Sequence, residues 1–166
     1  MTTDISTVDS NERGFPLIWT ITALLVLVVI AVAGYKYREQ MRNTVIATAS
    51  MDKQCMVNLS PCTASLSNAS AHLTISPQPI VATRPMQVSL QLEGLEAERV
   101  EIHFRGESMN MGLSQFTLVQ QAGGSYSGEA ILPVCVRNSM IWIADVLATT
   151  PNGKIAFPFR FESFHP

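Results

Sequence analysis

A long apolar stretch without charges dominates the N-terminal part of the chain. The stretch Phe15–Tyr35 contains no charged residue, and about 20 apolar residues in a helix are enough to cross the hydrocarbon core of a bilayer. Trp19 lies near one end and Tyr37 just beyond the other, where aromatic rings settle at a membrane interface. A cleaved signal peptide has a shorter apolar run and a basic leader. The pattern therefore predicts a retained transmembrane helix over residues 15–35, preceded by a short tail over residues 1–14.

Beyond this stretch, short segments alternate between apolar and polar residues, which is the pattern of half-buried β-strands. In Val100–Arg105 the apolar side chains would face a core, whereas His103 and the charged side chains would face the other way. Ser139–Thr149 is almost entirely apolar and is expected to be a central strand covered on both faces. Pro, Gly and Asn separate these segments. The strands predicted in this way are His72–Ser76, Met86–Leu92, Val100–Phe104, Phe116–Leu118, Tyr126–Leu132, Ser139–Thr149 and Ile155–Phe161.

The number and spacing of these strands predict an all-β fold. About seven short strands with a turn signal every 8–12 residues are typical of an immunoglobulin-like β-sandwich, here over residues 70–166. Pro158 cannot donate to the hydrogen-bond ladder, so the last strand is predicted to be an edge strand. The polar residues 36–69 are expected to form a stalk, which contains a pair of cysteines.

Composition excludes several classes of function. Charged residues make up 14% of the 166 residues, and the formal net charge is −2. Such a chain has no excess of Lys and Arg with which to neutralise phosphates, so nucleic acid is not an expected partner. The sequence also lacks the nucleophile elbow, the phosphate-binding loop, the dinucleotide fingerprint and the zinc-protease motif. We therefore do not expect an enzyme.

The cysteines bear on the compartment. Cys55 and Cys62 form a close pair, which suits a disulfide in an oxidising compartment. Cys135 would then be a free thiol, and a bridge from Cys135 to one of the other two is the alternative. Basic residues are more frequent after the helix, in residues 36–42, than before it, where Arg13 stands alone; this bias predicts a cytoplasmic C-terminal part. Because the cysteine pair and the β domain favour export, we expect a single-pass protein of the bacterial inner membrane with its C-terminal domain in the periplasm.

Sulfur-bearing residues in the second half of the chain are the candidates for chemistry. Met109 and Met111 have the same parity as His103, so in an extended segment all three would project from the exposed face. Thioethers suit a soft ion such as Cu(I) and do not bind protons near neutral pH. Cys135 or His103 would complete the ligand set. The alternative is that the two methionines and Cys135 pack as apolar residues and that His103 is a salt-paired surface residue; Met140 has the same ambiguity and favours the core.

Four short motifs in the C-terminal half resemble the FixH/YtkA-like family of membrane-anchored, exported β-sandwich domains. The family has a Met-rich turn, a Gly-x-Tyr-x-Gly strand, a Trp-bearing strand and a final apolar strand. The corresponding stretches of this chain are Gly106–Gly112, Gly124–Gly128, Met140–Trp142 and Asn152–Phe157. The resemblance implies a role in copper handling and in the assembly of copper-containing respiratory oxidases, with the two methionines of the turn linked to copper. The three cysteines depart from the family pattern.

Two functions follow as hypotheses. The first is a membrane-anchored periplasmic protein that binds Cu(I) through Met109, Met111, Cys135 and His103 and passes the ion on by ligand exchange. Its partners would be the membrane and a copper-containing oxidase or another copper chaperone. The second is a scaffold that binds no metal and holds a membrane complex together through the predicted edge strand Ile155–Phe161.

Overall fold

The computed structural model describes residues 15–109, 112–134 and 138–165, and it divides after Gln40 into two compact units. The first unit is built on helix α1 (Phe15–Arg42). The part of this helix from Ile18 to Arg42 is long and apolar enough to cross a membrane, and its apolar side chains are exposed. The predicted apolar helix is therefore confirmed, and it continues past Tyr35 because residues 36–42 contain no helix breaker.

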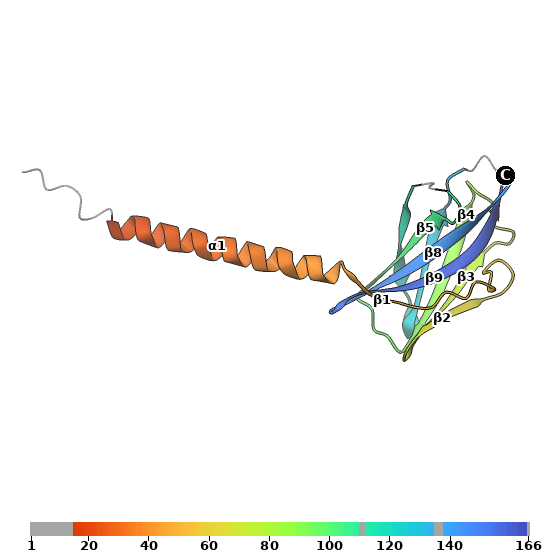
Figure 1. Cartoon of the computed structure of the whole chain (residues 1–166), viewed down its shortest axis with the longest axis horizontal. Coiled ribbons are helices and arrows are strands. Elements are labelled where there is room, and N and C mark those ends of the chain that lie inside the picture. The colour runs from red at the N-terminus through yellow and green to blue at the C-terminus, as the bar shows by residue number, and fades with distance from the viewer. Residues whose placement is uncertain (1–14, 110–111, 135–137, 166) are drawn as a thin grey trace, which may run out of the picture. The chain divides into compact units, whose positions relative to one another are not determined.

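The second unit is a β domain with nine strands among the described residues (Figure 1). All seven predicted strands are present, and β1 and β2 are added to them. The strands are β1 (Val45–Thr48), β2 (Cys62–Leu66), β3 (Ala69–Ser76), β4 (Pro85–Glu93), β5 (Arg99–Gly106), β6 (Ser114–Gln120), β7 (Ser125–Ile131), β8 (Ser139–Thr150) and β9 (Gly153–Phe164), with the 3-10 turn η1 (Ala122–Gly124) between β6 and β7.

The strands form a single sheet that is nearly closed into a barrel, and the expected seven-strand sandwich is thereby corrected. The strand order is β1-β9-β8-β5-β6-β7-β4-β3-β2. β6 joins the two halves because it pairs with β5 through Phe116 and with β7 through Val119. A sandwich would keep these halves as two separate sheets. Alternation along each strand gives the same sequence pattern in both folds, so it does not reveal this shared strand.

The segment between β1 and β2 brings the two ends of the strand order together. It runs along β9, where the Ala49 amide donates to the Ala156 carbonyl at 2.8 Å and the Val57 amide donates to the Arg160 carbonyl at 2.9 Å. The chain then enters β2. This strand is the last in the strand order, whereas β9 is next to the first, and the two strands are nevertheless in contact. We call residues 49–61 the strap, because they close the seam between β9 and β2.

Much of the expected stalk belongs to the β domain. Residues 36–69 contain the end of α1, both additional strands and the strap. Ala49, Val57 and Cys62 are at most 4% exposed and belong to the hydrophobic core. These residues therefore belong to the β domain and not to a stalk. The sequence did not indicate this, because a few small apolar residues in a polar stretch give only a weak periodic signal.

The core is built by strict alternation along β5 and its neighbours. Val100, Ile102 and Phe104 are fully buried, as predicted. β8 lies between β5 and β9, and it is buried on both faces: Trp142 points into the core, while Ile143 on the outer face is only 2% exposed. The prediction of a central strand covered on both sides is confirmed.

Strand β9 is not an edge strand, in contrast to the expectation based on Pro158. β9 pairs with β8 on one side and with β1 and the strap on the other. Ala156 and Arg160 turn their carbonyl groups toward the strap side, and Pro158 has the same parity. An N–H group at residue 158 would therefore point toward the strap, so its absence in proline removes no hydrogen bond from the ladder between β8 and β9.

Candidate functional site

The turn after β5 and the connection before β8 leave the sheet at the same end. β5 and β8 are antiparallel neighbours in which Gly106 lies opposite Trp142. The pairing extends one residue further, because the Glu107 amide donates to the Ile141 carbonyl at 3.0 Å. By sequence, Met111 belongs to the first of these connections and Cys135 to the second; both residues lie outside the described part of the chain.

Gly106, the last residue of β5, leaves no room for a side chain. A Cβ atom on residue 106 would lie 2.1 Å from the Met140 methyl carbon and 2.5 Å from the Met109 carbonyl oxygen. Neither distance is possible for a real side chain, so both groups occupy space that only glycine leaves free. Met140 itself is 4% exposed and belongs to the core, in agreement with the sequence-based preference.

Met109 does not continue the alternation of β5, because β5 ends at Gly106 and the chain bends over residues 107–109. The Met109 side chain is half-buried and packs against the hydrophobic core. The expectation that it projects from the same exposed face as His103 is corrected. Residues 105–109 line an open depression with a volume of about 390 Å³, so the half-buried thioether lies at the border between core and solvent.

Two arginines neutralise the carboxylates around the turn. The Arg160 guanidinium binds both oxygens of the Glu107 carboxylate: Nε lies 3.1 Å from Oε1 and Nη2 lies 2.8 Å from Oε2. Arg105 Nε lies 2.7 Å from Asp145 Oδ2. The described residues contain no group of three or more His, Cys, Asp and Glu side chains that could hold a metal ion. Each of these two carboxylates is thus held in an ion pair with an arginine.

His103 lies on the outer face of β5, opposite Asp145 of β8. Its neighbours on that face form ion pairs, among them Lys154 Nζ with Glu101 Oε2 at 3.2 Å. Nε2 of His103 is buried and has no hydrogen-bond partner among the residues that the structure describes. Burial lowers the pKa of the imidazole, and the Lys154 charge lowers it further, whereas Glu101 and Asp145 act to raise it. The structure thus places His103 on the outer face, while Met109 packs toward the core.

The lowered pKa of His103 predicts a pH-dependent stability. The unfolded chain, with an imidazole pKa near the reference value of 6.5, takes up this proton at a higher pH than the folded chain does. The free energy of unfolding should therefore fall as the pH drops below about 7, until the folded state is protonated too. In urea unfolding of the full chain in detergent at a series of pH values, His103→Gln should show a flatter dependence. Equal slopes for both proteins would contradict this prediction.

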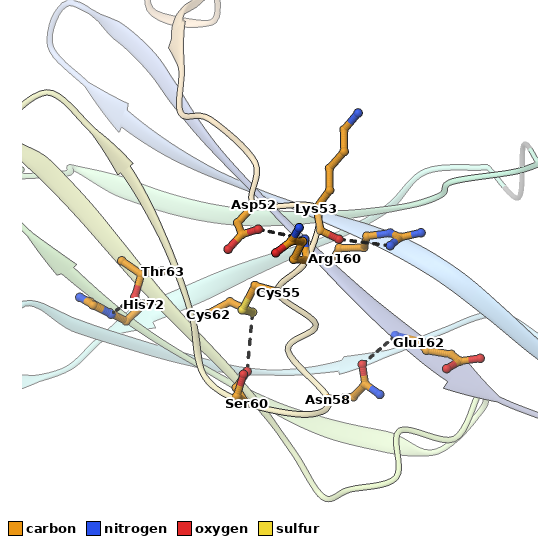
Figure 2. The surroundings of a disulfide bond; sticks show 11 residues. Asp52, Lys53, Cys55, Asn58, Ser60, Cys62, Thr63, His72, Arg160 and Glu162 are labelled. Atoms are coloured by element: carbon orange, nitrogen blue, oxygen red, sulfur yellow. Dashed lines mark hydrogen bonds between the residues drawn. A yellow bond between two sulfur atoms is a disulfide. The ribbon is translucent and has the colours of Figure 1, made fainter.

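The cysteine pair forms a disulfide that anchors the strap (Figure 2). Cys55 and Cys62 are bonded, with 5.9 Å between their Cα atoms. On either side of the bond, the Arg160 guanidinium donates to the Lys53 carbonyl and the Glu162 amide donates to the Asn58 side chain. The strap is therefore attached to β9 by hydrogen bonds and to the start of β2 by a covalent bond. The predicted pairing is confirmed; Cys135 lies outside the described residues.

Comparison with known proteins adds little to this geometry. No model of a known protein family matches the chain, and no curated protein matches it. Among solved structures, the chain is similar to an engineered protein from the Northeast Structural Genomics Consortium, with 12% sequence identity and a TM-score of 0.38. The match covers 64% of this chain and 20% of the engineered one, so the chain spans about a fifth of that protein's length.

Proposed function

We propose that this chain is a membrane-anchored periplasmic copper-binding protein of the bacterial inner membrane, which helps to deliver Cu(I) to a respiratory oxidase or to assemble one. The main support is the arrangement of β5 and β8: the connections that contain Met111 and Cys135 leave paired neighbouring strands at one end of the sheet. Met109 lies half-buried at that same end. Sulfur donors are the ligands that a soft ion such as Cu(I) prefers.

The surroundings of the turn favour sulfur over other donors. Glu107 and Asp145 are each bound by an arginine, so neither is a free oxygen ligand. Of the two residues considered to complete the site, His103 lies among ion pairs on the outer face of β5, so we propose Cys135 for this role. A site of two or three sulfur ligands would release Cu(I) by exchanging one ligand at a time with a recipient.

Removal of the two methionines of the turn tests this function. We expect Met109→Leu with Met111→Leu to lower Cu(I) affinity at least about tenfold, a loss of about 1.4 kcal/mol. Leucine is preferred to alanine because Met109 packs partly against the core, and a swap of similar volume leaves the melting temperature of the apo protein nearly unchanged. Affinity is measured on the full chain in detergent, without oxygen, by competition with a Cu(I) chelator.

A matched control replaces Met51, a half-buried methionine of the strap, by leucine, and it should bind Cu(I) as the wild type does. If the double variant keeps the wild-type affinity, the two methionines are not the ligands. If the wild type itself binds no more tightly than micromolar, the copper function fails.

A specific observation supports the alternative of a scaffold that binds no metal. Exposed apolar side chains gather at the same end of the sheet: Leu113 before β6, Ile131 at the end of β7 and Val134 beyond it are 44–57% exposed. Such side chains are typical of a surface that contacts another protein. The docking strand expected from the sequence, Ile155–Phe161, is not available for this purpose, because it lies inside β9 between two neighbours. Absence of Cu(I) binding would favour this second function.

A further inference from the structure

The outward side of β3, β4 and β7 is built almost entirely from hydroxyl and amide side chains. Along β3 and β4 every second side chain is buried, and the side chains between them point outward. We call two neighbouring rows of these outward residues the neutral face. The register of the three strands places in one row His72, Gln91 and Ser125, and in the next row Thr74, Ser89 and Ser127.

Charged side chains lie beside the neutral face and not on it. The charged residues of β3, β4 and β7, which the structure describes in full, are Glu93 and Glu129. They belong to the two flanking rows, one on each side. The outward side of β5, β8 and β9 is different, because ion pairs such as that of Lys154 with Glu101 lie there. The sheet therefore has a half with many outward charges and a half with uncharged polar groups.

Polar groups of the neutral face are available to a ligand. Thr74 and Ser89 are exposed, and their side chains have no hydrogen-bond partner among the residues that the structure describes. Ser127 Oγ accepts a hydrogen bond from Gln121 Nε2 at 3.2 Å and keeps its own proton to donate. Gln91 donates to a carbonyl of η1 through Nε2, which leaves its Oε1 as an acceptor. The face thus offers both donors and acceptors.

This composition disfavours several classes of ligand. A ligand with phosphate groups requires Lys or Arg, and β3, β4 and β7 contain neither. The centre of a protein–protein interface is rich in aromatic residues, Met and Arg and poor in Ser. The aromatic residue of these strands, Tyr126, points into the core. The face suits an uncharged ligand whose groups both donate and accept hydrogen bonds, and the hydroxyl groups of sugars have this property.

We propose that the neutral face binds an uncharged polysaccharide chain. Neighbouring strands are about 4.8 Å apart, and outward residues of one strand are about 6.8 Å apart. The polar groups of the face therefore repeat in both directions, as the hydroxyl groups of a sugar polymer do. No aromatic ring is present for a sugar to stack on, so binding requires contacts with several sugar units. Glu93 and Glu129 in the flanking rows disfavour an anionic polysaccharide.

This inference goes beyond copper binding and does not depend on it. The candidate copper site lies at one end of β5 and β8, whereas the neutral face belongs to β3, β4 and β7. Loss of either function leaves the other untouched, so the two proposals are tested separately.

The first test locates the binding surface. The probe is chitohexaose, an uncharged chain of N-acetylglucosamine units, added to the full chain labelled with nitrogen-15. The detergent must have no sugar headgroup, because such a headgroup would compete for the face. We expect the amide signals of β3, β4 and β7 to shift and those of β5, β8 and β9 to stay in place. The single sugar N-acetylglucosamine should bind at least about tenfold more weakly than the hexamer, and a hexamer of galacturonate should not bind.

The second test removes two hydroxyl groups from the centre of the face. We expect Thr74→Ala with Ser89→Ala to lower the affinity for chitohexaose at least about fivefold, since each hydroxyl contributes one hydrogen bond to the ligand. The matched control is Gln115→Ala with Thr117→Ala, two exposed polar residues of β6 that lie opposite β5. This control should bind as the wild type does. All four residues are outward-facing, so both variants should keep the melting temperature of the wild type to within a few degrees.

Three results would overturn the proposal. The first is a wild type that does not bind chitohexaose. The second is full affinity in the Thr74 and Ser89 double variant, with amide shifts outside β3, β4 and β7. The third is a galacturonate hexamer that binds as tightly as chitohexaose, because the absence of charge on the face would then select nothing.

Discussion

Replacement of Trp142 by alanine is expected to lower the free energy of unfolding by about 4 kcal/mol. Trp142 is fully buried in the hydrophobic core of the β domain, and truncation of a large aromatic side chain leaves a cavity that the surrounding strands fill only in part. Its Nε1 donates to Ser163 Oγ at 2.9 Å, across β8 and β9. The variant therefore also leaves the Ser163 hydroxyl without a partner, and Ser163 is 2% exposed.

The measurement is urea unfolding of the full chain in detergent, followed by the β-sheet circular dichroism signal. Ser163→Ala is the matched control: it removes the same hydrogen bond without a large cavity, and we expect it to cost about 1–3 kcal/mol. A loss below about 1.5 kcal/mol in Trp142→Ala would contradict the tight packing of this side chain. The difference between the two variants separates the contribution of packing from that of the hydrogen bond.

Most of the strands could be predicted because their signal is local. In β5, the alternation of Val100, Ile102 and Phe104 with polar residues is visible in the sequence and corresponds to full burial in the structure. The apolar run of β8 indicates burial on both faces for the same reason. In both strands, the pattern of apolar and polar residues within the strand itself is enough to predict its burial.

The closure of the sheet could not be predicted in this way. β1 and β2 have four and five residues, and the inward residues of β2 are Cys62 and Ala64, whose small side chains give little periodic signal. The pairing of β6 with both β5 and β7 joins consecutive strands, but the alternation along β6 does not reveal that this one strand belongs to both halves of the sheet. Pro158 gave a false indication because its missing N–H faces the strap, which an isolated strand does not reveal.

The candidate site shows the same limit. The parity rule placed Met109 on the exposed face, yet the alternation ends where Gly106 admits the Met140 methyl group and the chain turns back. No local pattern indicates that Met140, more than thirty positions away in the sequence, lies beneath this turn. The proximity arises from the register of β5 and β8. The cysteine pair, in contrast, is local and was predicted from its spacing.

Removal of the disulfide is expected to cost about 2.5 kcal/mol of the free energy of unfolding. Cys55 and Cys62 are separated by seven positions, and closure of a loop of about eight residues restricts the unfolded chain by roughly that amount at 25 °C. We expect Cys55→Ala with Cys62→Ala to show this loss in urea unfolding under non-reducing conditions. The wild type should lose a similar amount when a reductant is added, whereas the double variant should not respond to it.

A thiol titration of the unfolded protein completes the experiment. Without a reductant, the wild type should have one free thiol, that of Cys135, and Cys135→Ala should have none while keeping the stability of the wild type. The strap would still be attached to β9 through Ala49, Val57 and Asn58 after loss of the disulfide, so the domain should remain folded. If the double variant is as stable as the wild type, these hydrogen bonds alone close the seam between β9 and β2, and the covalent bond contributes nothing to the closure.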